Sequence, residues 1–416
     1  MHRKLLEPLL LFFLLVLAGG CGGGSSSSQS ETPTPAQIRK LDSIVTDLVT
    51  TNFTPGIAVG ISHNGKTIYT RAAGNRTLSP DQPVQITTPF EIGSVTKQFT
   101  TAGILLLVQN GTVALTDLVS KYVSDYVYSP NMTIGELLTM LSGTPSHDAD
   151  IYNQLNPDLP VTPQTIAALN NLPLDFPTGS KMAYSNYGMW LLGEIIRRTT
   201  GLSYGDYLDQ NIFAPLGMTS TYLYGTRINP AEAVGYAHQF QPDPFTPAPD
   251  PPSEFIDAQG GLTSTVGDLL RWDAALTARR VIREPLYTTM LTVPTLPGGG
   301  AIPTYTGPGD GGGEVILRLN DGSPSMYAMG WMVPGGSYFF HPGGTNGFTS
   351  MNANFDDGTS IVILTNHHLG SVPIGDVIPN LAAKLYNVLH PSIPTAPALT
   401  ILQLPTGQPT PDPPAP

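Results

Sequence analysis

The sequence predicts a mixed α/β fold of the α+β type, in which a sheet flanked by an N-terminal and a C-terminal helix carries an inserted, mainly helical subdomain. Three observations lead to this prediction. Strand-like runs occur near both ends of the segment 36–390, helical patterns fill the region from about 94 to 225, and a helix is expected at each end of the segment. We therefore expect one catalytic unit over residues 36–390, with a ligand site where the sheet meets the helices.

The first elements follow from local patterns. A helix is expected over residues 36–50, where apolar residues recur at helical spacing: Ile38, Leu41, Ile44, Val45 and Leu48. Two β-like runs come next, Gly56–Ser62 and Thr67–Ala73, and the residues between them include Asn64-Gly65, which is a strong hairpin signal. The catalytic unit is therefore expected to open with a helix and a β-hairpin.

Helical patterns dominate the middle of the chain, and strands return near its end. Segments such as 94–111 and 186–201 are apolar at helical spacing and stop at a glycine. Beyond about residue 325, strands are expected at Ala328–Val333, Ser337–His341, Thr349–Phe355 and Ile361–Thr365. Asp356-Asp357-Gly358 predicts the last turn, and a closing helix is expected over residues 373–388.

Composition limits the classes of function. The chain has 416 residues, a hydrophobic content of 40% and a formal net charge of −12, with a pI near 4.9. The hydrophobic content is enough to fill a core, whereas nucleic acid demands a basic surface, so no nucleic-acid partner is expected. Glycine (44) and proline (41) are abundant, which predicts many turns and long loops.

The N-terminus is typical of an export signal. A basic run at residues 2–4 precedes a mostly apolar stretch that is too short to span a bilayer comfortably. Residues 1–21 end at Cys21, the chain's single cysteine, and resemble a bacterial lipobox, although Ala18 stands where leucine is usual. The hypothesis is an exported bacterial lipoprotein, periplasmic or at the cell surface, that is membrane-anchored through acyl chains on Cys21. An ordinary secretory signal, cleaved nearby, is the alternative.

Two more segments are expected to lie outside the packed domain. Residues 22–35 consist largely of Gly, Ser, Thr and Pro and cannot bury apolar surface, so they predict a flexible tether. Residues 391–416 form a Pro-rich tail that we expect to be mostly disordered.

Ser94-Val95-Thr96-Lys97 is the only Ser-x-x-Lys in the chain. Residues i and i+3 share a helix face, so the Ser94 hydroxyl and the Lys97 amine can approach each other at the start of a helix. The helix N-terminus favours a developing oxyanion, and a desolvated lysine can help to remove the serine proton. The four residues alone leave another interpretation open, in which Ser94 is a helix N-cap and Lys97 a solvated first-turn residue.

The surrounding residues 90–100 (FEIGSVTKQFT) resemble the nucleophile segment of class C β-lactamases and their relatives, which include D-alanyl-D-alanine carboxypeptidases and β-lactamase-like esterases. The resemblance implies a β-lactamase/penicillin-binding-protein-like fold with an antiparallel sheet. It also implies Ser94 as the nucleophile of a serine hydrolase that forms an acyl-enzyme with help from Lys97. No metal or organic cofactor is expected, and a monomer is the expected state.

Tyr184-Ser185-Asn186 matches the Tyr-x-Asn motif of the same family. By resemblance, Tyr184 is the general base that carries the nucleophile's proton to the leaving group, with Lys97 as the cation that favours a phenolate. Asn186 would donate a hydrogen bond to the substrate and help to position Lys97. The alternative is a structural helix start, with Asn186 as its cap and Tyr184 in the core.

His341-Pro342-Gly343-Gly344 fits the third motif of the family, which is Lys-Thr-Gly or His-Thr-Gly in many relatives. The resemblance places this strand on the other side of the cleft, with Gly343 and Gly344 at the substrate and the Gly344 N–H joining that of Ser94 in an oxyanion hole. His341 is expected to be cationic or neutral near pH 7 and so to make activity pH-dependent. A structural histidine at a strand end is the alternative.

Pro342 departs from the family pattern. In β-lactam-binding members a Thr or Ser hydroxyl at this position helps to hold a carboxylate, and proline has neither a hydroxyl nor an N–H. This weakens the case for a β-lactamase and, less decisively, for a carboxypeptidase, whereas esterases of the family need no carboxylate anchor.

The resemblance extends in order over most of residues 40–368. It includes the stretches 133–143, 212–221, 260–272 and Met329-Gly330-Trp331. Within the first of these, Met140-Leu141 departs from the family's usual His-Thr-Ser-Gly run, in a region interpreted as structural. His367-His368 lacks acidic or cysteine partners at ligand spacing, so a metal site is not expected.

Three functions remain open at this point. The first is a hydrolase of esters or small acyl and amide compounds, which Pro342 favours. The second is a D-alanyl-D-alanine carboxypeptidase or peptidase on cell-wall peptides, or a β-lactamase, and an exported, tethered domain favours the peptidase. The third is a ligand-binding or sensing protein without turnover, against which Ser94, Lys97, Tyr184 and Asn186 together argue. The expected partners are a small-molecule or peptide substrate and the membrane.

Overall fold

The computed structural model describes residues 32–51, 53–145, 161–237, 245–249, 253–295, 299–302, 327–334, 338–368 and 374–391. The chain divides into two units, Met1–Thr32 and Pro33–Pro416, and nearly all described residues belong to the second. The predictions for the export signal, Cys21 and the tether at 22–31 lie outside these ranges, as does the tail after residue 391. Within the described ranges, no helix combines the length and the apolar character that crossing a membrane requires.

A six-stranded antiparallel sheet forms the centre of the second unit, with the strand order β3-β2-β1-β11-β10-β9. Its strands are β1 (Gly56–His63), β2 (Lys66–Leu78), β3 (Asp81–Pro83), β9 (Tyr338–Thr345), β10 (Phe348–Phe355) and β11 (Thr359–Thr365). The first and last thirds of the chain meet where β1 pairs with β11, from Ile57 opposite Thr365 to His63 opposite Thr359. The predicted sheet, with strands from both ends of the chain, is confirmed.

The predicted hairpin connects β1 and β2. Asn64 and Gly65 have φ angles of 50° and 74°, the left-handed conformation that a tight hairpin turn requires and that Asn and Gly tolerate best. The second predicted turn, between β10 and β11, has Gly358 at φ 86°. Both turns could be read from the sequence because their chemistry is local.

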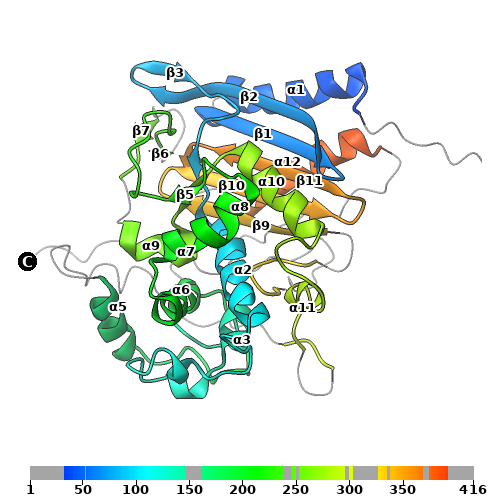
Figure 1. Ribbon diagram of the computed structural model, residues 1–416. Helices are drawn as coiled ribbons and strands as arrows, with labels where there is room; N and C mark the ends of the chain where they lie inside the picture. Colours follow the sequence, from blue (N-terminus) through cyan, green and yellow to red (C-terminus); the bar gives the residue numbers. More distant parts are fainter. Residues whose placement is uncertain are drawn as a thin grey trace, which may run out of the picture. The chain divides into compact units, whose positions relative to one another are not determined.

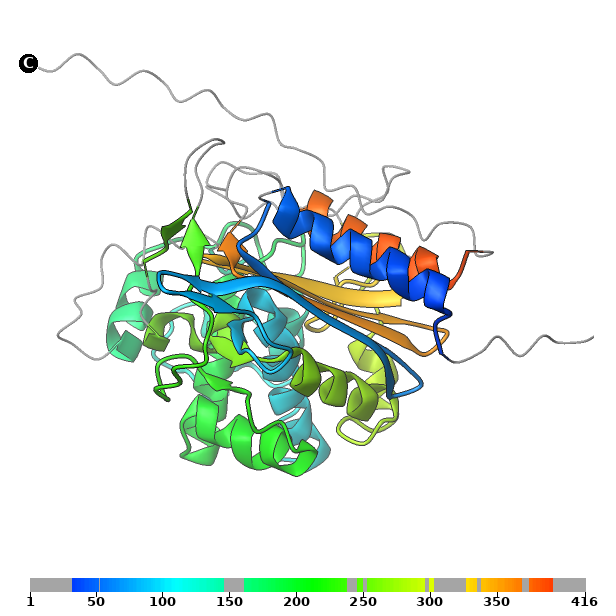
Figure 2. The same cartoon turned by 90° about the horizontal axis from the view of Figure 1, so that it is seen from above.

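Helices cover the two faces of the sheet. The helices α1 (Pro35–Thr50) and α12 (Ile374–Leu389) lie side by side on one face, as Figure 2 shows. On the other face, α10 (Val266–Thr277) packs against β1 and β11, beside α2 (Thr96–Gln109) (Figure 1). The predicted helices at both ends of the catalytic unit are therefore confirmed.

The inserted subdomain is mainly helical and lies below the sheet in the view of Figure 1. Its described helices are α3 (Ile134–Leu138), α5 (Val161–Asn170), α6 (Asn186–Thr200), α7 (Tyr204–Leu208), α8 (Ala214–Leu216), α9 (Ser253–Gly260) and α11 (Leu286–Met290). Two small three-stranded sheets join it to the rest: β4 (Phe90–Glu91), β8 (Leu262–Ser264) and β5 (Tyr222–Leu223), and β12 (His367–His368), β6 (Tyr236–Ala237) and β7 (Thr246–Pro247).

The predicted strand at Ala328–Val333 is wrong. This segment is a tight turn, in which the Ala328 N–H donates to the Trp331 carbonyl at 2.8 Å and Gly330 has a φ of 73°. A Cβ on Gly330 would overlap Thr101 Oγ1 and lie 2.8 Å from the Lys97 carbonyl oxygen, so the turn packs directly against α2. The apolar run therefore reflects burial, and burial alone does not distinguish a strand from a packed turn.

Candidate active site

Ser94 lies in a single 3₁₀ turn, Gly93–Val95, that leads into α2. The sequence predicted that Ser94 opens the helix, but α2 begins at Thr96, and its N-cap, Val95, makes no side-chain capping bond. The Ser94 hydroxyl is therefore not used as a helix cap, and it is partly exposed. The interpretation of Ser94 as an N-cap is wrong, and its hydroxyl faces Lys97 instead.

Lys97 is fully buried, with 0% of its surface exposed, so the alternative of a solvated lysine is also wrong. Its Nζ donates to Ser94 Oγ at 3.1 Å, to Asn186 Oδ1 at 2.8 Å and to the Gln259 carbonyl oxygen at 2.5 Å. An ammonium group has three N–H donors, and these acceptors match them. A buried charge is tolerated where its hydrogen-bonding capacity is met in this way.

Tyr184 and Asn186 stand at the start of α6, beside Lys97. The cap of α6 is Ser185, whose Oγ accepts a hydrogen bond from the Gly188 N–H at 3.0 Å. The structural alternative required Asn186 to be the cap, but Asn186 is the first residue of the helix. Its side-chain oxygen, Oδ1, accepts a hydrogen bond from Lys97. Lys97 Nζ lies 4.7 Å from the centre of the half-buried Tyr184 ring, in a cation–π contact.

His341 is buried on β9, with 1% of its surface exposed. Burial, reinforced by the positive charge of Lys97, lowers its pKa to about 3, so of the two expected charge states His341 has the neutral one at pH 7. Its Nδ1 lies 2.6 Å from the Pro342 carbonyl oxygen, which can only accept, so Nδ1 carries the hydrogen. The Nε2 atom is then an acceptor, and the Tyr327 hydroxyl donates to it at 3.1 Å.

Tyr327 is a site residue that the sequence did not reveal. Its ring contacts both His341 and Tyr184 edge-on, at centroid distances of 5.7 and 6.0 Å. Burial raises its pKa well above the ordinary value, so its hydroxyl remains a donor. The one signal in the sequence is its position two residues before Met329-Gly330-Trp331, a stretch that is part of the family resemblance.

Gln259 is a second residue that the sequence missed, because it contributes a main-chain carbonyl and not a side-chain motif. It lies in the last turn of α9, directly before the Gly260-Gly261 pair. Its carbonyl is a Lys97 acceptor, as described above. Main-chain groups of this kind leave no mark in the sequence.

Gly344 N–H faces the nucleophile turn. Phe340 exchanges both of its backbone hydrogen bonds with Met332, so its N–H and C=O point away from β10. These groups alternate in direction along a strand, so Pro342 and Gly344 also point away from β10. A Cβ on Gly93 would lie 2.6 Å from the Gly344 nitrogen, which shows how closely β9 approaches the turn that holds Ser94.

Gly343 completes this close approach. A side chain at Gly343 would overlap the Ile92 carbonyl oxygen and Ser350 Oγ. Ser350 Oγ itself donates to the Ile92 carbonyl at 2.7 Å and so ties β10 to the residue before the nucleophile turn. The two glycines of the third motif therefore let β9 lie directly against the turn.

Met140 supports the Tyr184 segment from behind. It has a φ of 61°, which is uncommon for a residue other than glycine, and it is buried. Its carbonyl accepts from the Ala183 N–H at 3.1 Å, and its sulfur accepts from the Ser185 N–H at 3.3 Å. The departure from the family pattern at this position is thus placed directly behind Tyr184.

No group of three or more His, Cys, Asp or Glu side chains suited to a metal ion occurs in the part of the chain that the structure describes. His367 Nδ1 lies 2.6 Å from the Phe53 carbonyl oxygen and so donates its hydrogen to the main chain.

The structure thus brings seven predicted residues together between β9, the nucleophile turn and the start of α6: Ser94, Lys97, Tyr184, Asn186, His341, Gly343 and Gly344. The Ser94 hydroxyl lies beside the buried Lys97 amine, and the Tyr184 phenol ring lies against that amine. The Gly344 N–H on β9 faces the turn that holds Ser94. These are the parts that acyl transfer needs: a nucleophile, a route for its proton and a donor for an oxyanion.

The chain is similar in sequence to a known protein. Penicillin-binding protein 4* of Bacillus subtilis (strain 168) is 26% identical over 324 residues, which cover 73% of this chain and 66% of that protein. The match therefore spans slightly less than two thirds of that relative.

Solved structures share the fold. The octameric penicillin-binding protein homologue from Pyrococcus abyssi is 26% identical, with a TM-score of 0.65, over 79% of this chain and 73% of that one. The D-amino acid amidase from Ochrobactrum anthropi SV3 is 23% identical, with a TM-score of 0.70, over 86% of this chain and 99% of that one. The family model described as Beta-lactamase matches residues 41–376, from α1 into α12. The chain belongs to the β-lactamase family of serine hydrolases.

Proposed function

We propose that this protein forms an acyl-enzyme on Ser94 and hydrolyses uncharged esters or small amides. The observation that carries the proposal is the contact of 3.1 Å between Ser94 Oγ and the fully buried Lys97 Nζ. A serine hydroxyl is a weak nucleophile until a neighbouring base takes its proton. In this site that base is Tyr184, whose phenolate form the Lys97 ammonium favours.

The proposed reaction has two stages. Ser94 Oγ attacks the substrate carbonyl while its proton passes to the Tyr184 phenolate, which the Lys97 ammonium stabilises, and the N–H groups of Ser94 and Gly344 stabilise the oxyanion. Tyr184 then protonates the leaving alcohol or amine as its bond to the carbonyl breaks. Water attacks the acyl-enzyme in the second stage and gives a proton to Tyr184, which passes it to Ser94 Oγ as the acid is released. Asn186 accepts a hydrogen bond from Lys97 through Oδ1 and donates one from its side-chain NH2 group to the substrate.

The third motif supports an uncharged substrate. His341 is neutral at pH 7 and both of its ring nitrogens are engaged, with Pro342 and Tyr327. Pro342 supplies neither a hydroxyl nor an N–H. A substrate carboxylate would therefore find no cation on this strand, whereas an ester or a primary amide needs none.

The second candidate is hydrolysis of a D-amino-acid amide or of a D-amino-acid peptide end. It is favoured by the likeness to a D-amino acid amidase over 86% of the chain, and to a penicillin-binding protein by sequence. An amide of an amino acid also lacks the carboxylate that the third motif is not built to hold. A cell-wall peptide that ends in a carboxylate fits the motif less well, as does a penicillin.

The test compares four compounds on the same protein: a fluorophosphonate, p-nitrophenyl butyrate, D-phenylalanine amide and a fluorescent penicillin. We expect fluorophosphonate labelling and turnover of the ester, the amide or both, all of which Ser94→Ala abolishes without unfolding the protein. The matched control is Ser43→Ala, which removes an exposed hydroxyl on α1 and should leave labelling and turnover unchanged.

The outcomes separate the candidates. Turnover that survives in Ser94→Ala refutes the proposal. A stable penicillin adduct on Ser94 with no turnover of any compound supports a penicillin-binding or sensing protein, and penicillin hydrolysis supports a β-lactamase. Turnover of the amide in preference to the ester selects the second candidate.

We also propose that the protein is exported and held at the membrane by a lipid on Cys21. The basic, apolar and small-residue segments before Cys21 support this, as does the Gly/Ser/Pro-rich stretch after it.

A further inference from the structure

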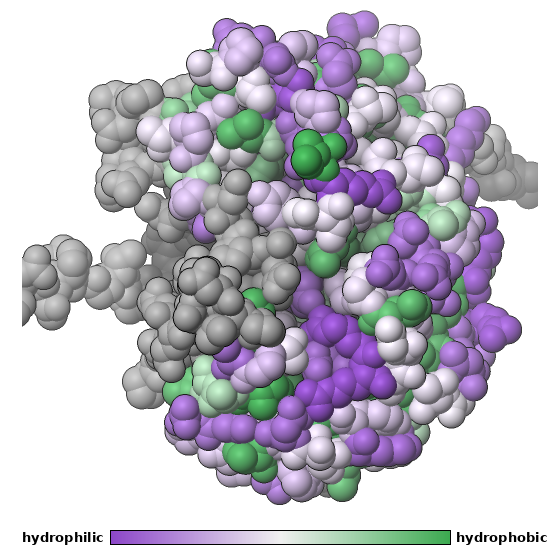
Figure 3. Space-filling model, turned by 60° about the vertical axis from the view of Figure 1, so that its left-hand side comes forward, coloured by the Kyte–Doolittle hydropathy of each residue, from purple (hydrophilic) through white to green (hydrophobic). Residues whose placement is uncertain are grey.

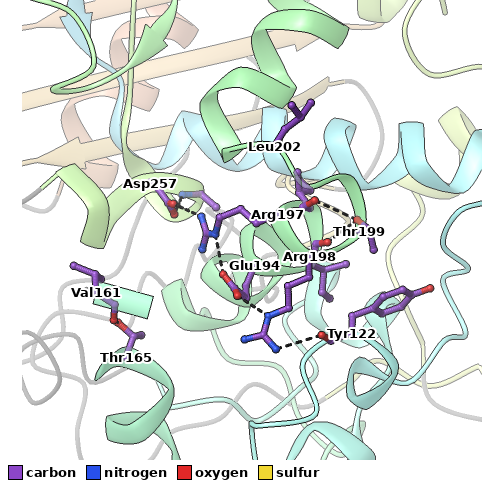
Figure 4. Close-up of polar contacts among 12 residues, drawn as sticks. Tyr122, Val161, Thr165, Glu194, Arg197, Arg198, Thr199, Leu202 and Asp257 are labelled. Atoms are coloured by element: carbon purple, nitrogen blue, oxygen red, sulfur yellow. Dashed lines mark hydrogen bonds and ion pairs between the residues drawn. The ribbon is translucent and has the colours of Figure 1, made fainter. Parts of the chain in front are cut away.

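An ion-pair network on α6 lies outside the described site (Figure 4). Arg197 Nε contacts Glu194 Oε2 at 2.8 Å, and Arg197 Nη1 contacts Asp257 Oδ2 at 2.5 Å. The neighbouring Arg198 shares Glu194, at 2.6 Å, but its other partner is Asp125, at 2.7 Å. The two adjacent arginines thus share Glu194, but each forms its second ion pair with a different aspartate.

Asp257 belongs to the last turn of α9, which borders the active site. Its main-chain carbonyl accepts from the Gly261 N–H at 2.9 Å, and its side chain accepts from the Ala258 N–H. The Ala258 carbonyl in turn accepts from Thr100 Oγ1 on α2, at 2.6 Å. Asp257 therefore fixes the backbone of the turn that carries Gln259.

Of the three hydrogen bonds that Lys97 Nζ donates, the one to the Gln259 carbonyl oxygen is the shortest, at 2.5 Å. A hydrogen bond to a charged donor depends strongly on distance and angle, and inside a protein it is worth more than in water. The position of this one carbonyl therefore affects how Lys97 shares its hydrogens among its partners, Ser94 included.

We propose that Arg197 is a positioning residue for catalysis, which holds Asp257 and thereby presents the Gln259 carbonyl to Lys97. The inference rests on the proposed role of Lys97 in moving the Ser94 proton. Arg197 does not touch the reacting atoms, and it acts through one salt bridge and one helical turn. Arg198, which is bonded to the same Glu194, has no such connection to α9 among its described contacts.

The effect of removing Arg197 has a definite direction. The titratable groups that face Asp257 are Arg197 and Glu194 from α6 and Tyr204 from α7. Burial raises the pKa of Asp257 even with Arg197 beside it, so removing Arg197 raises that pKa further and makes the buried carboxylate harder to keep charged. The ion pair to Arg197 is lost in either charge state of Asp257, and the turn that carries Gln259 is held less firmly.

A loosened Gln259 carbonyl disfavours the ammonium form of Lys97, whose titratable neighbours in the cleft are Tyr184 and His341. The limb of the pH–rate profile that follows the Lys97 amine should therefore move to lower pH in Arg197→Gln. We expect kcat to fall about tenfold while KM stays unchanged, because the carbonyl position matters to proton transfer and not to substrate binding.

The experiment measures kcat, KM, the pH–rate profile and thermal stability for the full-length chain, Arg197→Gln and Arg198→Gln. Both variants remove one guanidinium from Glu194, so both should lower the melting temperature. The proposal expects the loss of kcat and the shifted limb in Arg197→Gln alone. If the two variants have the same kcat and the same profile, the role of Arg197 is only structural and the proposal is wrong.

A second variant tests the connection through Asp257. Asp257→Asn keeps the shape of the side chain, and the double variant Arg197→Gln/Asp257→Asn should be no slower than Arg197→Gln, since both changes break the same link. Losses that multiply would refute it, and this comparison remains decisive if one single variant folds poorly. Ser94→Ala in the same assay separates the two proposals: if it stays active the proposed function fails, and if it is inactive while Arg197→Gln matches Arg198→Gln, only this inference fails.

Discussion

Lys97 and His341 are both buried, but the surroundings of Lys97 stabilise a positive charge and those of His341 disfavour one. Lys97 is given acceptors from Ser94, Asn186 and the Gln259 main chain. His341 has one acceptor, the Pro342 carbonyl, and one donor, the Tyr327 hydroxyl. Burial and the nearby amine together keep its ring neutral, so positive charge in the cleft is concentrated on one residue.

The neutral state of His341 makes a prediction about stability. Its pKa is about 3 in the folded protein and about 6.5 in the unfolded chain, so below pH 6.5 the unfolded chain binds a proton that the folded protein does not. This contribution to stability is complete above pH 6.5 and is lost as the pH falls toward 3. Between pH 7 and 5 it should cost the native protein about 2 kcal/mol relative to His341→Asn, which does not titrate.

Urea unfolding of both proteins at pH 7, 6 and 5 measures this difference. The difference between the two proteins is the quantity to use, because both retain Asp273. Burial raises the pKa of that carboxyl to about 7, and its contribution changes with pH in the opposite direction. Parallel stability curves for the two proteins would mean that His341 is protonated in the folded state.

At the residue scale, the sequence predicted the side chains that carry chemistry but not their charge states. Ser94, Lys97, Tyr184 and Asn186 stand in short motifs, so their meeting could be expected. The neutrality of His341 depends on its burial and on Lys97, which is far away in the sequence. Gln259 contributes only its main chain, which no residue pattern encodes.

At the scale of elements, the contact between β9 and the nucleophile turn fixes the cleft. Gly343→Ala places a methyl group against the Ile92 carbonyl oxygen and Ser350 Oγ, so β9 must move away from the turn. We expect a loss of about 1–3 kcal/mol in unfolding free energy. We also expect a fall of about 100-fold in kcat, since Gly344 moves with the strand. Urea unfolding and ester hydrolysis measure the two effects.

Gly267→Ala is the matched control for this prediction. Gly267 lies in the first turn of α10, and the nearest atom to a Cβ there is 3.6 Å away. Alanine favours a helix by about 1 kcal/mol over glycine, so this variant should be as stable as the native protein or more so, with unchanged turnover. Full activity in Gly343→Ala would show that the cleft tolerates a displaced β9.

The elements that the sequence predicted well are those with local signals. The hairpin at Asn64-Gly65 and the helix that begins at Pro35 each have their own turn or cap chemistry. Thr34 caps that helix and exchanges bonds with Gln37 in a capping box. The segment Ala328–Val333 has no such signal, and its turn is imposed by close packing against Lys97 and Thr101 on α2.

At the scale of the molecule, both ends of the catalytic unit are built into one side of the sheet. Gln37 on α1 donates to the carbonyls of Val388 and Leu389 on α12, at 2.9 and 3.2 Å. On the face shown in Figure 3, green apolar residues are scattered among polar ones. The exposed large apolar side chains of the described ranges are Ile38, Leu118, Val127, Ile228 and Val234.

The lipid anchor is tested on the whole chain. Expressed in a bacterial host and labelled with a palmitate analogue, the native protein should carry the label and sediment with membranes until detergent is added. Cys21→Ser should lose the label and leave the membrane fraction, because a single cysteine carries the attachment. A native protein that is exported without label would instead indicate an ordinary secretory signal.

The β9 edge of the central sheet is closed to a further strand. On β9, Phe340 is already bonded to Met332, Pro342 has no N–H to offer, and Gly344 faces the nucleophile turn. At the opposite edge, β3 has three residues, ends at Pro83 and covers β2 only from Asn75 to Leu78. Short, proline-containing edges prevent copies of a protein from pairing edge to edge into aggregates. The same strand that lines the cleft therefore also protects this protein against self-association when many copies are crowded together.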